Sequence, residues 1–243
     1  MGIGFGKVIL FNEHFVVYGL PAIASAIGAK TTALVERRPG SGVELKDERP
    51  QTEGYKVEKL AQQKESLDRM LKFMNIDTGN NAFTVTLAGD LIAASGVGAS
   101  AASCTAIARA FSQELGLNYS DDRVNNVAYE GEKGYHGTPS GIDNTAATFG
   151  GLIWYKREGP SQLMERMKLK KPVEIVMGNT GIVSDTKVVV AGVKERKERE
   201  PDKYTGIFKI AERLAHDARR QLEAFHLEEV GVYMDQNHEL LQQ

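Results

Sequence analysis

The segment SGVGASAAS, residues 95–103, restricts the fold most strongly, because every side chain in it except one is no larger than a hydroxymethyl group. Such a run contributes little to a core, but it allows the backbone to approach a ligand or a neighbouring element closely. A helix that begins just after the two glycines would point unpaired N–H groups and the positive end of its dipole at an anion. The segment therefore predicts a phosphate cradle, with close helix packing as the alternative.

Two known phosphate-binding patterns can be compared with this segment. The Walker pattern ends in Gly-Lys-Ser/Thr, and no lysine occurs between Asp90 and Glu114, so an ordinary P-loop NTPase is excluded. The letters GVGASA match the dinucleotide pattern Gly-x-Gly-x-x-Ala, but that pattern leads through one helix to a strand that ends in an acid. A second capped helix follows Gly116 instead. A dinucleotide-dependent oxidoreductase stays as a subordinate alternative.

Composition narrows the classes of partner. The chain has 243 residues, 42% of them hydrophobic, which is enough for one large domain or two modest ones. Its 30 basic and 32 acidic residues give a net charge of −2, so no global field favours nucleic acid or an anionic membrane. The uncharged stretch from Leu91 to Ala108 holds too many Gly, Ser and Thr residues for a membrane span. A single cysteine, Cys104, and an N-terminus without a signal-peptide pattern predict a reducing cytoplasm.

Hydrophobic periodicity predicts a mixture of strands and helices, that is, an α+β fold. Strands are expected over KVILF, FVVYG, KTTALVERR, GVELK, AFTVTLAGD and LIWYKR, with another after Pro172. Helices are expected over 57–74, over 99–115, after an N-cap at Ser120, and over most of 204–243. The stretch HGTPSGIDNTAATFGG has the composition of a loop. The basic run before Pro172 predicts a boundary between a first domain, 1–171, and a second, 172–243.

Three blocks carry a family resemblance when they are taken together. GKVILFNEHFVVYG, SGVGASAAS and HGTPSGIDNTAATFGG closely resemble motifs of the GHMP kinases, and the members that act on mevalonate match best. GNTGIVSDTKVVVAGV is similar to a later strand and threonine-containing helix start of that family. The resemblance runs from about Gly6 to Val193, and the combination is far more specific than any one block.

The resemblance implies a fold and an activity. The fold would be the two-domain α+β GHMP fold, with the second domain incomplete, because the family's third glycine-rich motif has no counterpart after Val193. The activity would be transfer of the γ-phosphate of ATP, with Mg²⁺, to the primary hydroxyl of mevalonate, a small-molecule partner. Another acceptor stays open, namely phosphomevalonate, homoserine or a sugar, and so does an inactive ligand-binding regulator. A homodimer also stays open.

The resemblance further assigns residues to the nucleotide and the metal. The residues expected around the ATP phosphates are Gly96, Val97, Gly98, Ala99, Ser100 and Ala101. Mg²⁺ would be held by the hydroxyl of Ser100 and the carboxylate of Glu132, since this ion prefers a few hard oxygen ligands with phosphates and water. On a helical wheel Glu132 lies about 80° from the centre of the apolar stripe, at the border of the buried face.

The remaining assignments concern the transfer itself. Asp143 would be the catalytic carboxylate that orients or deprotonates the acceptor hydroxyl, and Lys7 would lie beside it. The residues expected near the acceptor are Glu13, His14, Ser140 and Thr186. His136 would shape the same loop or lie next to the substrate.

Several positions depart from the family pattern. Phe5 stands where the family has proline before Gly-Lys, and the proline that flanks the family's phosphate loop is missing. Asn12 stands where the family has glycine before Glu-His, and asparagine tolerates a positive φ better than most residues, so the turn is expected to persist. Ala99 replaces the first serine of the phosphate loop, which removes one hydroxyl but leaves Ser100.

Overall fold

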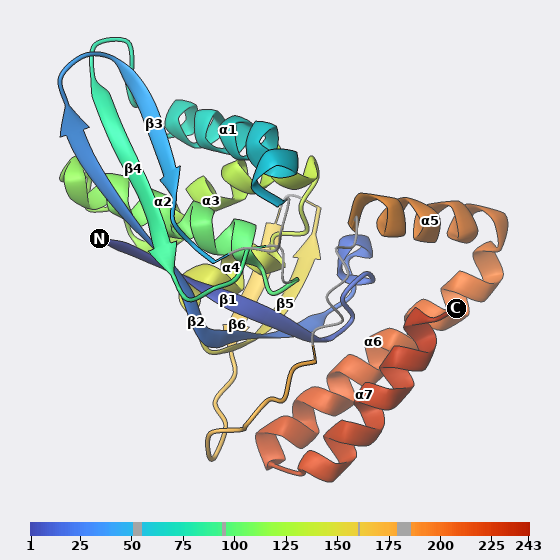
Figure 1. The fold of residues 1–243 in the computed structure, drawn as a ribbon. Helices are drawn as coiled ribbons and strands as arrows, with labels where there is room; N and C mark the ends of the chain where they lie inside the picture. The colour runs from blue at the N-terminus through green and yellow to red at the C-terminus, as the bar shows by residue number, and fades with distance from the viewer. Residues whose placement is uncertain (51–54, 94–95, 160, 179–185) are drawn as a thin grey trace. The chain divides into compact units, whose positions relative to one another are not determined.

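The first two thirds of this chain contain both strands and helices, and its last part is helical (Figure 1). The computed structural model describes residues 1–50, 55–93, 96–159, 161–178 and 186–243, without the side chains of 55–58 and 186–191. In chain order the elements are β1 (Gly2–Phe11), η1 (Val16–Tyr18), β2 (Ala22–Arg38), β3 (Gly42–Asp47), α1 (Tyr55–Phe73), β4 (Ala82–Gly89), α2 (Ala99–Glu114), α3 (Asp121–His136), α4 (Ile142–Phe149), β5 (Leu152–Glu158), β6 (Ser161–Arg166), α5 (Thr186–Arg199), α6 (Pro201–Ala224) and α7 (Leu227–Leu241).

The contacts within the chain divide it into two units. Unit 1 consists of Met1–Val8 and Ala26–Gly150, and unit 2 consists of Ile9–Ser25 and Gly151–Gln243. The predicted domain boundary near Lys171 stays a prediction, because these two compact units need not fold independently as domains do.

Unit 1 combines strands with the helices α1 to α4. Strand β3 pairs in parallel with β4, and β4 pairs antiparallel with the later part of β2. Alternate residues of β4, among them Phe83, Val85 and Leu87, are buried, as period-two patterning requires when one face of a sheet meets a core. The helices gather on one side of these strands (Figure 1), and Phe83 packs edge-on against Phe111 of α2 with ring centroids 5.3 Å apart.

Two glycines of β1 are needed for its contact with α2. A Cβ atom on Gly4 would lie 2.1 Å from the carbonyl oxygen of Ala102, and one on Gly2 would lie 2.0 Å from that of Ala106. The strand backbone therefore lies directly on the helix, which is the close packing that the sequence left open. Cys104 is buried in the same helix, and desolvation together with the negative charge of Glu132 raises the pKa of its thiol.

Unit 2 joins antiparallel strand pairs to helices. The first residues of β2 pair with β5, as in Ile23↔Trp154, and β5 pairs with β6. Helices α6 and α7 run antiparallel side by side (Figure 1). One cluster of the core contains Phe11 and Ile23 together with Trp154 and apolar residues of α6.

Most predicted elements are confirmed, including the α+β class, helices α1, α2 and α3 and the helical end of the chain. The predicted strand FVVYG is wrong, because Val16–Tyr18 forms a 3-10 turn that Gly19 ends with φ +82°. The predicted loop HGTPSGIDNTAATFGG is wrong in its second half, which is helix α4. Burial of Ile142, Ala146 and Ala147 stabilises that helix despite the loop-like composition.

The strand predicted after Pro172 is also wrong. Residues 172–178 have no strand pairing, and Val176 is 92% exposed. A short apolar run forms a stable strand only with a partner and a face to bury. Strand β6 was not predicted, since SQLMER lacks β-branched residues. Within the described ranges, no helix is both long and apolar enough to cross a bilayer.

Candidate active site

The phosphate loop predicted from the sequence ends in an open helix start. Gly96 and Gly98 have φ values of 77° and 74°, in a region that residues with a Cβ rarely adopt. Gly98 is the N-cap residue of α2, and its carbonyl accepts a hydrogen bond from the backbone N–H of Ala102 at 3.0 Å. No side chain in the described part of the chain caps this start. The first N–H groups of α2 can therefore bind an anion.

Lys7 of β1 lies beside this loop. Its backbone N–H donates to the carbonyl of Val97 at 2.9 Å, and its aliphatic stem packs where a Cβ on Gly98 would be, 2.7 Å from Lys7 Cγ. Its side chain is only 7% exposed, and its Nζ lies 3.0 Å from Oδ1 of Asp143. The two residues are 136 positions apart, so only the fold brings the predicted pair together.

Asp143 lies in the first turn of α4, after a left-handed N-cap at Gly141 with φ 91°. The contact with Lys7 has the distance of an ion pair but not the direction of a hydrogen bond, and Oδ1 has no hydrogen-bond partner among the described residues. The carboxylate thus keeps the capacity to accept a proton from a bound hydroxyl. The lysine offsets its negative charge at the same time.

Glu132 lies deeper than its helix position predicts. Its side chain is 1% exposed, and its Oε1 has no hydrogen-bond partner in the described ranges. Burial, followed by the charge of Asp143, raises the pKa of Glu132 to about 8, although a hydrogen bond with Ser100 opposes the shift. His136 Nε2 lies 3.7 Å from Glu132 Oε2 and 3.4 Å from Ser100 Oγ. The predicted metal ligands are thus brought together with a third polar group.

These donors fit a magnesium ion that arrives with its nucleotide. A buried carboxylate oxygen without a partner is costly unless a cation or a donor meets it. No group of three or more His, Cys, Asp or Glu residues within the described ranges could hold a metal alone. One carboxylate and one hydroxyl instead match the usual Mg²⁺ site, where phosphates and water complete the coordination.

The predicted acceptor residues divide between the two units. Ser140 lies in unit 1, where its hydroxyl accepts a hydrogen bond from the Ile142 N–H at 3.4 Å, one turn before Asp143. Glu13 and His14 belong to unit 2 and are exposed and half-buried, respectively. Thr186 begins α5, as the resemblance implies, but its side chain lies outside the described residues.

Asn12 holds the turn that carries Glu13 and His14. Its φ of 67° confirms that asparagine keeps the left-handed conformation expected where the family has glycine. Its side-chain amide donates to the carbonyls of Pro21 and Ala211. Its backbone N–H donates to Asn237 Oδ1, and its Oδ1 accepts a hydrogen bond from Asn237 Nδ2. The turn is therefore fixed by buried polar contacts.

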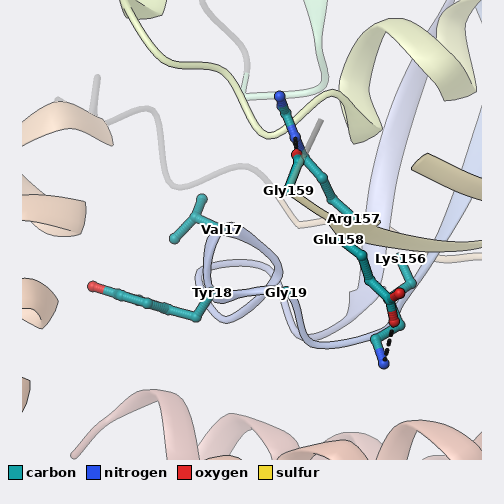
Figure 2. Close-up of a pocket in the computed structure, with 7 residues that line it drawn as sticks. All are labelled: Val17, Tyr18, Gly19, Lys156, Arg157, Glu158 and Gly159. Carbon is teal, nitrogen blue, oxygen red and sulfur yellow. Dashed lines mark hydrogen bonds and ion pairs between the residues drawn. The ribbon is translucent and has the colours of Figure 1, made fainter. Parts of the chain in front are cut away.

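A pocket of about 510 Å³ lies elsewhere in unit 2, between η1 and the end of β5 (Figure 2). It is lined by Val17, Tyr18, Gly19, Lys156, Arg157, Glu158 and Gly159. Lys156 Nζ lies 3.1 Å from Glu158 Oε1, and Arg157 Nε donates to the backbone carbonyl of Gly159. None of the predicted site residues lines this pocket.

Sequence reasoning missed one residue near the site and understated another. Arg49 binds the first turn of α2, but in the sequence it is one charge in KDERP, with no pattern to distinguish it. His136 was expected to shape a loop or lie next to the substrate, and it ends α3 beside Ser100 and Glu132. Its spacing of four from Glu132 on one helix could have indicated this contact.

The fold and the arrangement of charges around the start of α2 define a small-molecule phosphotransferase. The family described as GHMP kinases N terminal domain matches residues 57–151. Mevalonate kinase of Pyrococcus furiosus is 32% identical over 97% of this chain and 75% of its own length. That of Thermococcus gammatolerans is 30% identical, with the same two coverages.

Solved structures agree with this class. The crystal structure of L. major mevalonate kinase in complex with R-mevalonate is 36% identical, with a TM-score of 0.89, and covers all of this chain and 74% of that one. Methanococcus jannaschii mevalonate kinase, at 19% identity and a TM-score of 0.70, shares the fold. The chain belongs to the GHMP kinase family, in its mevalonate kinase branch. It is a small-molecule kinase, and the family uses ATP as the phosphoryl donor.

Proposed function

We propose that this chain transfers the γ-phosphoryl group of ATP to the primary hydroxyl of mevalonate. The observation that carries the proposal is the pairing of Lys7 with Asp143, at 3.0 Å, in the unit that holds the open start of α2. Support for the acceptor comes from the relatives, which are named mevalonate kinases, and from the L. major structure, which contains R-mevalonate.

The nucleotide would be bound by backbone rather than by charged side chains. The left-handed glycines and the free N–H groups of the first turn would surround the phosphates with Gly96, Val97, Gly98, Ala99, Ser100 and Ala101. Ser100 and Glu132 would hold the magnesium ion, which neutralises phosphate charge when it is bound. The unpartnered Oε1 of Glu132 supports this assignment.

The transfer needs one proton acceptor and one cation from the chain. Asp143 would accept the proton of the acceptor hydroxyl. The oxygen of that hydroxyl would form a bond to the γ-phosphorus, while the bond from this phosphorus to the β–γ bridging oxygen breaks and ADP is released. Lys7 would hold Asp143 in place and offset charge on the phosphoryl group in transit. The unused hydrogen-bonding capacity of Asp143 Oδ1 supports this role.

Recognition of the acceptor is proposed for Glu13, His14, Ser140 and Thr186. Buried hydrogen bonds fix the turn before Glu13, and Ser140 lies just before α4. The homodimer, the cytoplasmic location and the boundary at Lys171 stay predictions.

The test is the formation of ADP by the purified chain with and without mevalonate. We expect turnover only when mevalonate is present, and equal turnover without it, or with another GHMP acceptor instead, contradicts the proposed substrate. Asp143→Asn should lower kcat by about 10²- to 10⁴-fold, the usual contribution of a positioned base, and leave ATP binding intact. Asp122→Asn is the matched control, because Asp122 is an exposed acid in the first turn of α3. Near-normal turnover in Asp143→Asn would show that its role is misassigned.

A further inference from the structure

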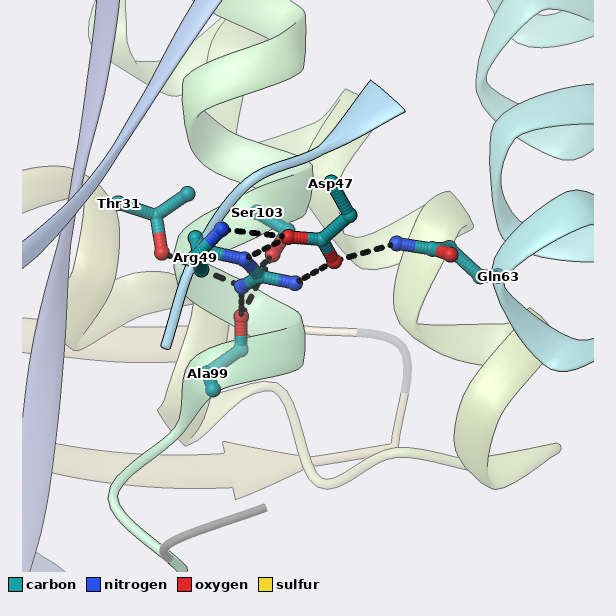
Figure 3. A network of polar contacts seen from close by, with 6 residues as sticks. All are labelled: Thr31, Asp47, Arg49, Gln63, Ala99 and Ser103. Atoms are coloured by element: carbon teal, nitrogen blue, oxygen red, sulfur yellow. Dashed lines mark hydrogen bonds and ion pairs between the residues drawn. The ribbon is translucent and has the colours of Figure 1, made fainter. Parts of the chain in front are cut away.

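Arg49 is buried at the end of β3, where it forms a two-pronged ion pair with Asp47 (Figure 3). Its Nε donates to Asp47 Oδ1 at 2.9 Å, and one terminal nitrogen donates to Oδ2 at 2.7 Å. The side chains are 3% and 8% exposed, respectively. Gln63 of α1 completes the carboxylate by donating to Oδ2 at 3.0 Å.

The other terminal nitrogen of Arg49 faces α2. It donates to Ser103 Oγ at 2.6 Å, to the carbonyl of Ala99 at 3.2 Å and to Thr31 Oγ1 of β2 at 3.3 Å. Ser103 Oγ in turn donates to the same Ala99 carbonyl at 2.7 Å. One guanidinium group therefore connects β3, β2 and the first turn of α2, and through Asp47 it also reaches α1 (Figure 3).

Because burying this ion pair is costly, we infer that its geometry matters more than the stability it adds. Taking both charges out of water cancels much of their attraction, so a buried ion pair by itself adds little stability over apolar residues of the same size. The contacts nevertheless satisfy the charges well. Burial would raise the pKa of Asp47, but the hydrogen bonds and charge of Arg49 hold it below its ordinary value. The planar fork of arginine also fixes direction, which a lysine cannot do.

The guanidinium of Arg49 fixes the first turn of α2, where the phosphates are proposed to bind. Ala99, whose carbonyl receives two of these hydrogen bonds, is the first residue of α2 and directly precedes Ser100. The guanidinium lies between Asp47 and α2, with its charge toward the end of the helix that already carries positive dipole.

We infer that Arg49 is a positioning residue for the nucleotide, which sets the first turn of α2, and with it Ser100, in the place where the triphosphate and its cation bind. The inference rests on the proposed function, because it takes α2 as the phosphate site. Arg49 does not touch the reacting atoms and acts through Ala99 and Ser103.

The test is Arg49→Lys, which keeps the charge and removes the fork. We expect the KM for ATP to rise about tenfold, since displacements of about 1 Å in a positioned group cost up to about a hundredfold. The KM for the acceptor should change less than about twofold. The matched control is Arg109→Lys, at the opposite end of α2, where the arginine binds the carbonyls of Ile3 and Thr148 and the carboxylate of Asp121.

Both variants should lower the midpoint of urea unfolding, so only the ATP effect separates positioning from general support. The inference is overturned if Arg49→Lys has the same KM for ATP as the unmodified chain, or if Arg109→Lys raises that KM as much as Arg49→Lys does. Ser103→Ala carries the test if Arg49→Lys does not fold, because it removes the hydrogen bonds that Ser103 makes with Arg49 and with the Ala99 carbonyl and leaves the ion pair. A weaker affinity for ATP then supports the inference, and an unchanged affinity overturns it.

Calorimetric binding of ATP without any acceptor distinguishes this inference from the proposed function. Loss of ATP affinity in Arg49→Lys supports positioning even if mevalonate is not phosphorylated. Turnover of mevalonate with an unaltered ATP affinity in Arg49→Lys supports the function and overturns the positioning role.

Discussion

Replacing Glu132 by glutamine should make the ligand-free protein more stable at neutral and alkaline pH. The unfolded carboxyl group ionises near 4.5, whereas burial and the charge of Asp143 raise its pKa in the folded protein to about 8. The folded protein therefore holds a proton that the unfolded chain has lost, and the stability from this group is present below pH 4.5 and disappears as the pH rises through about 8. Glutamine mimics the protonated side chain at every pH.

The size of the effect follows from the shift. For each pH unit between the two pKa values, the free energy of unfolding of the wild-type protein falls by about 1.4 kcal/mol, whereas the glutamine in the variant contributes no such loss. Between about pH 5.5 and pH 7.5 the free energy of unfolding of Glu132→Gln should thus gain about 3 kcal/mol relative to wild type. Groups that titrate in both proteins cancel in the difference.

The assay is urea unfolding followed by circular dichroism, without magnesium or nucleotide, at several pH values. Glu130→Gln is the control, because Glu130 lies on the same helix, is 25% exposed and pairs with Lys133; it should show no comparable gain at high pH. A difference between Glu132→Gln and wild type that stays flat across this range would refute the reasoning. Glu132 would then be ionised in the ligand-free fold, and its missing partner would need another explanation.

Three further substitutions test local geometry. Gly96→Ala should lose about 1–2 kcal/mol of stability, since it places a Cβ at positive φ, and Gly98→Ala should lose more, because its Cβ would also lie 2.7 Å from Lys7 Cγ. Only Gly98→Ala should also lower kcat strongly, because no atom of the described residues lies within 4 Å of a Cβ on Gly96. Equal kcat values in the two variants would contradict this. Asn237→Ala should lower the free energy of unfolding by about 2–4 kcal/mol, because it leaves the N–H and Oδ1 of Asn12 buried without partners. Urea unfolding measures that loss, and a loss below about 1 kcal/mol would show that water replaces the amide.

The sequence predicted elements well where local pattern and tertiary packing agree, and poorly where they conflict. Ser120 caps α3 as expected, with its Oγ accepting from the Arg123 N–H at 3.3 Å. Helix α4 was missed because Gly, Thr and Asn in its segment favour loops, while burial of Ile142 and Ala146 decides the outcome. Local propensity carries no information about such long-range contacts.

The candidate site shows the same division. The glycine conformations before α2 follow from residue type, and the fold places Lys7 against Asp143 as the family resemblance implies. The proposed role of Arg49 could not be inferred from the sequence, because its partners are Asp47 nearby and Ser103 far along the chain. Whether a charged side chain such as that of Arg49 is buried depends on the whole fold, and no local motif indicates it.

The sequence has one thiol, and that thiol lies inside α2, buried and with a raised pKa. A reagent that alkylates thiolates will therefore react with the folded protein only when this helix opens. The rate of labelling therefore measures how often α2 opens, and nucleotide bound at the proposed phosphate site should slow the labelling.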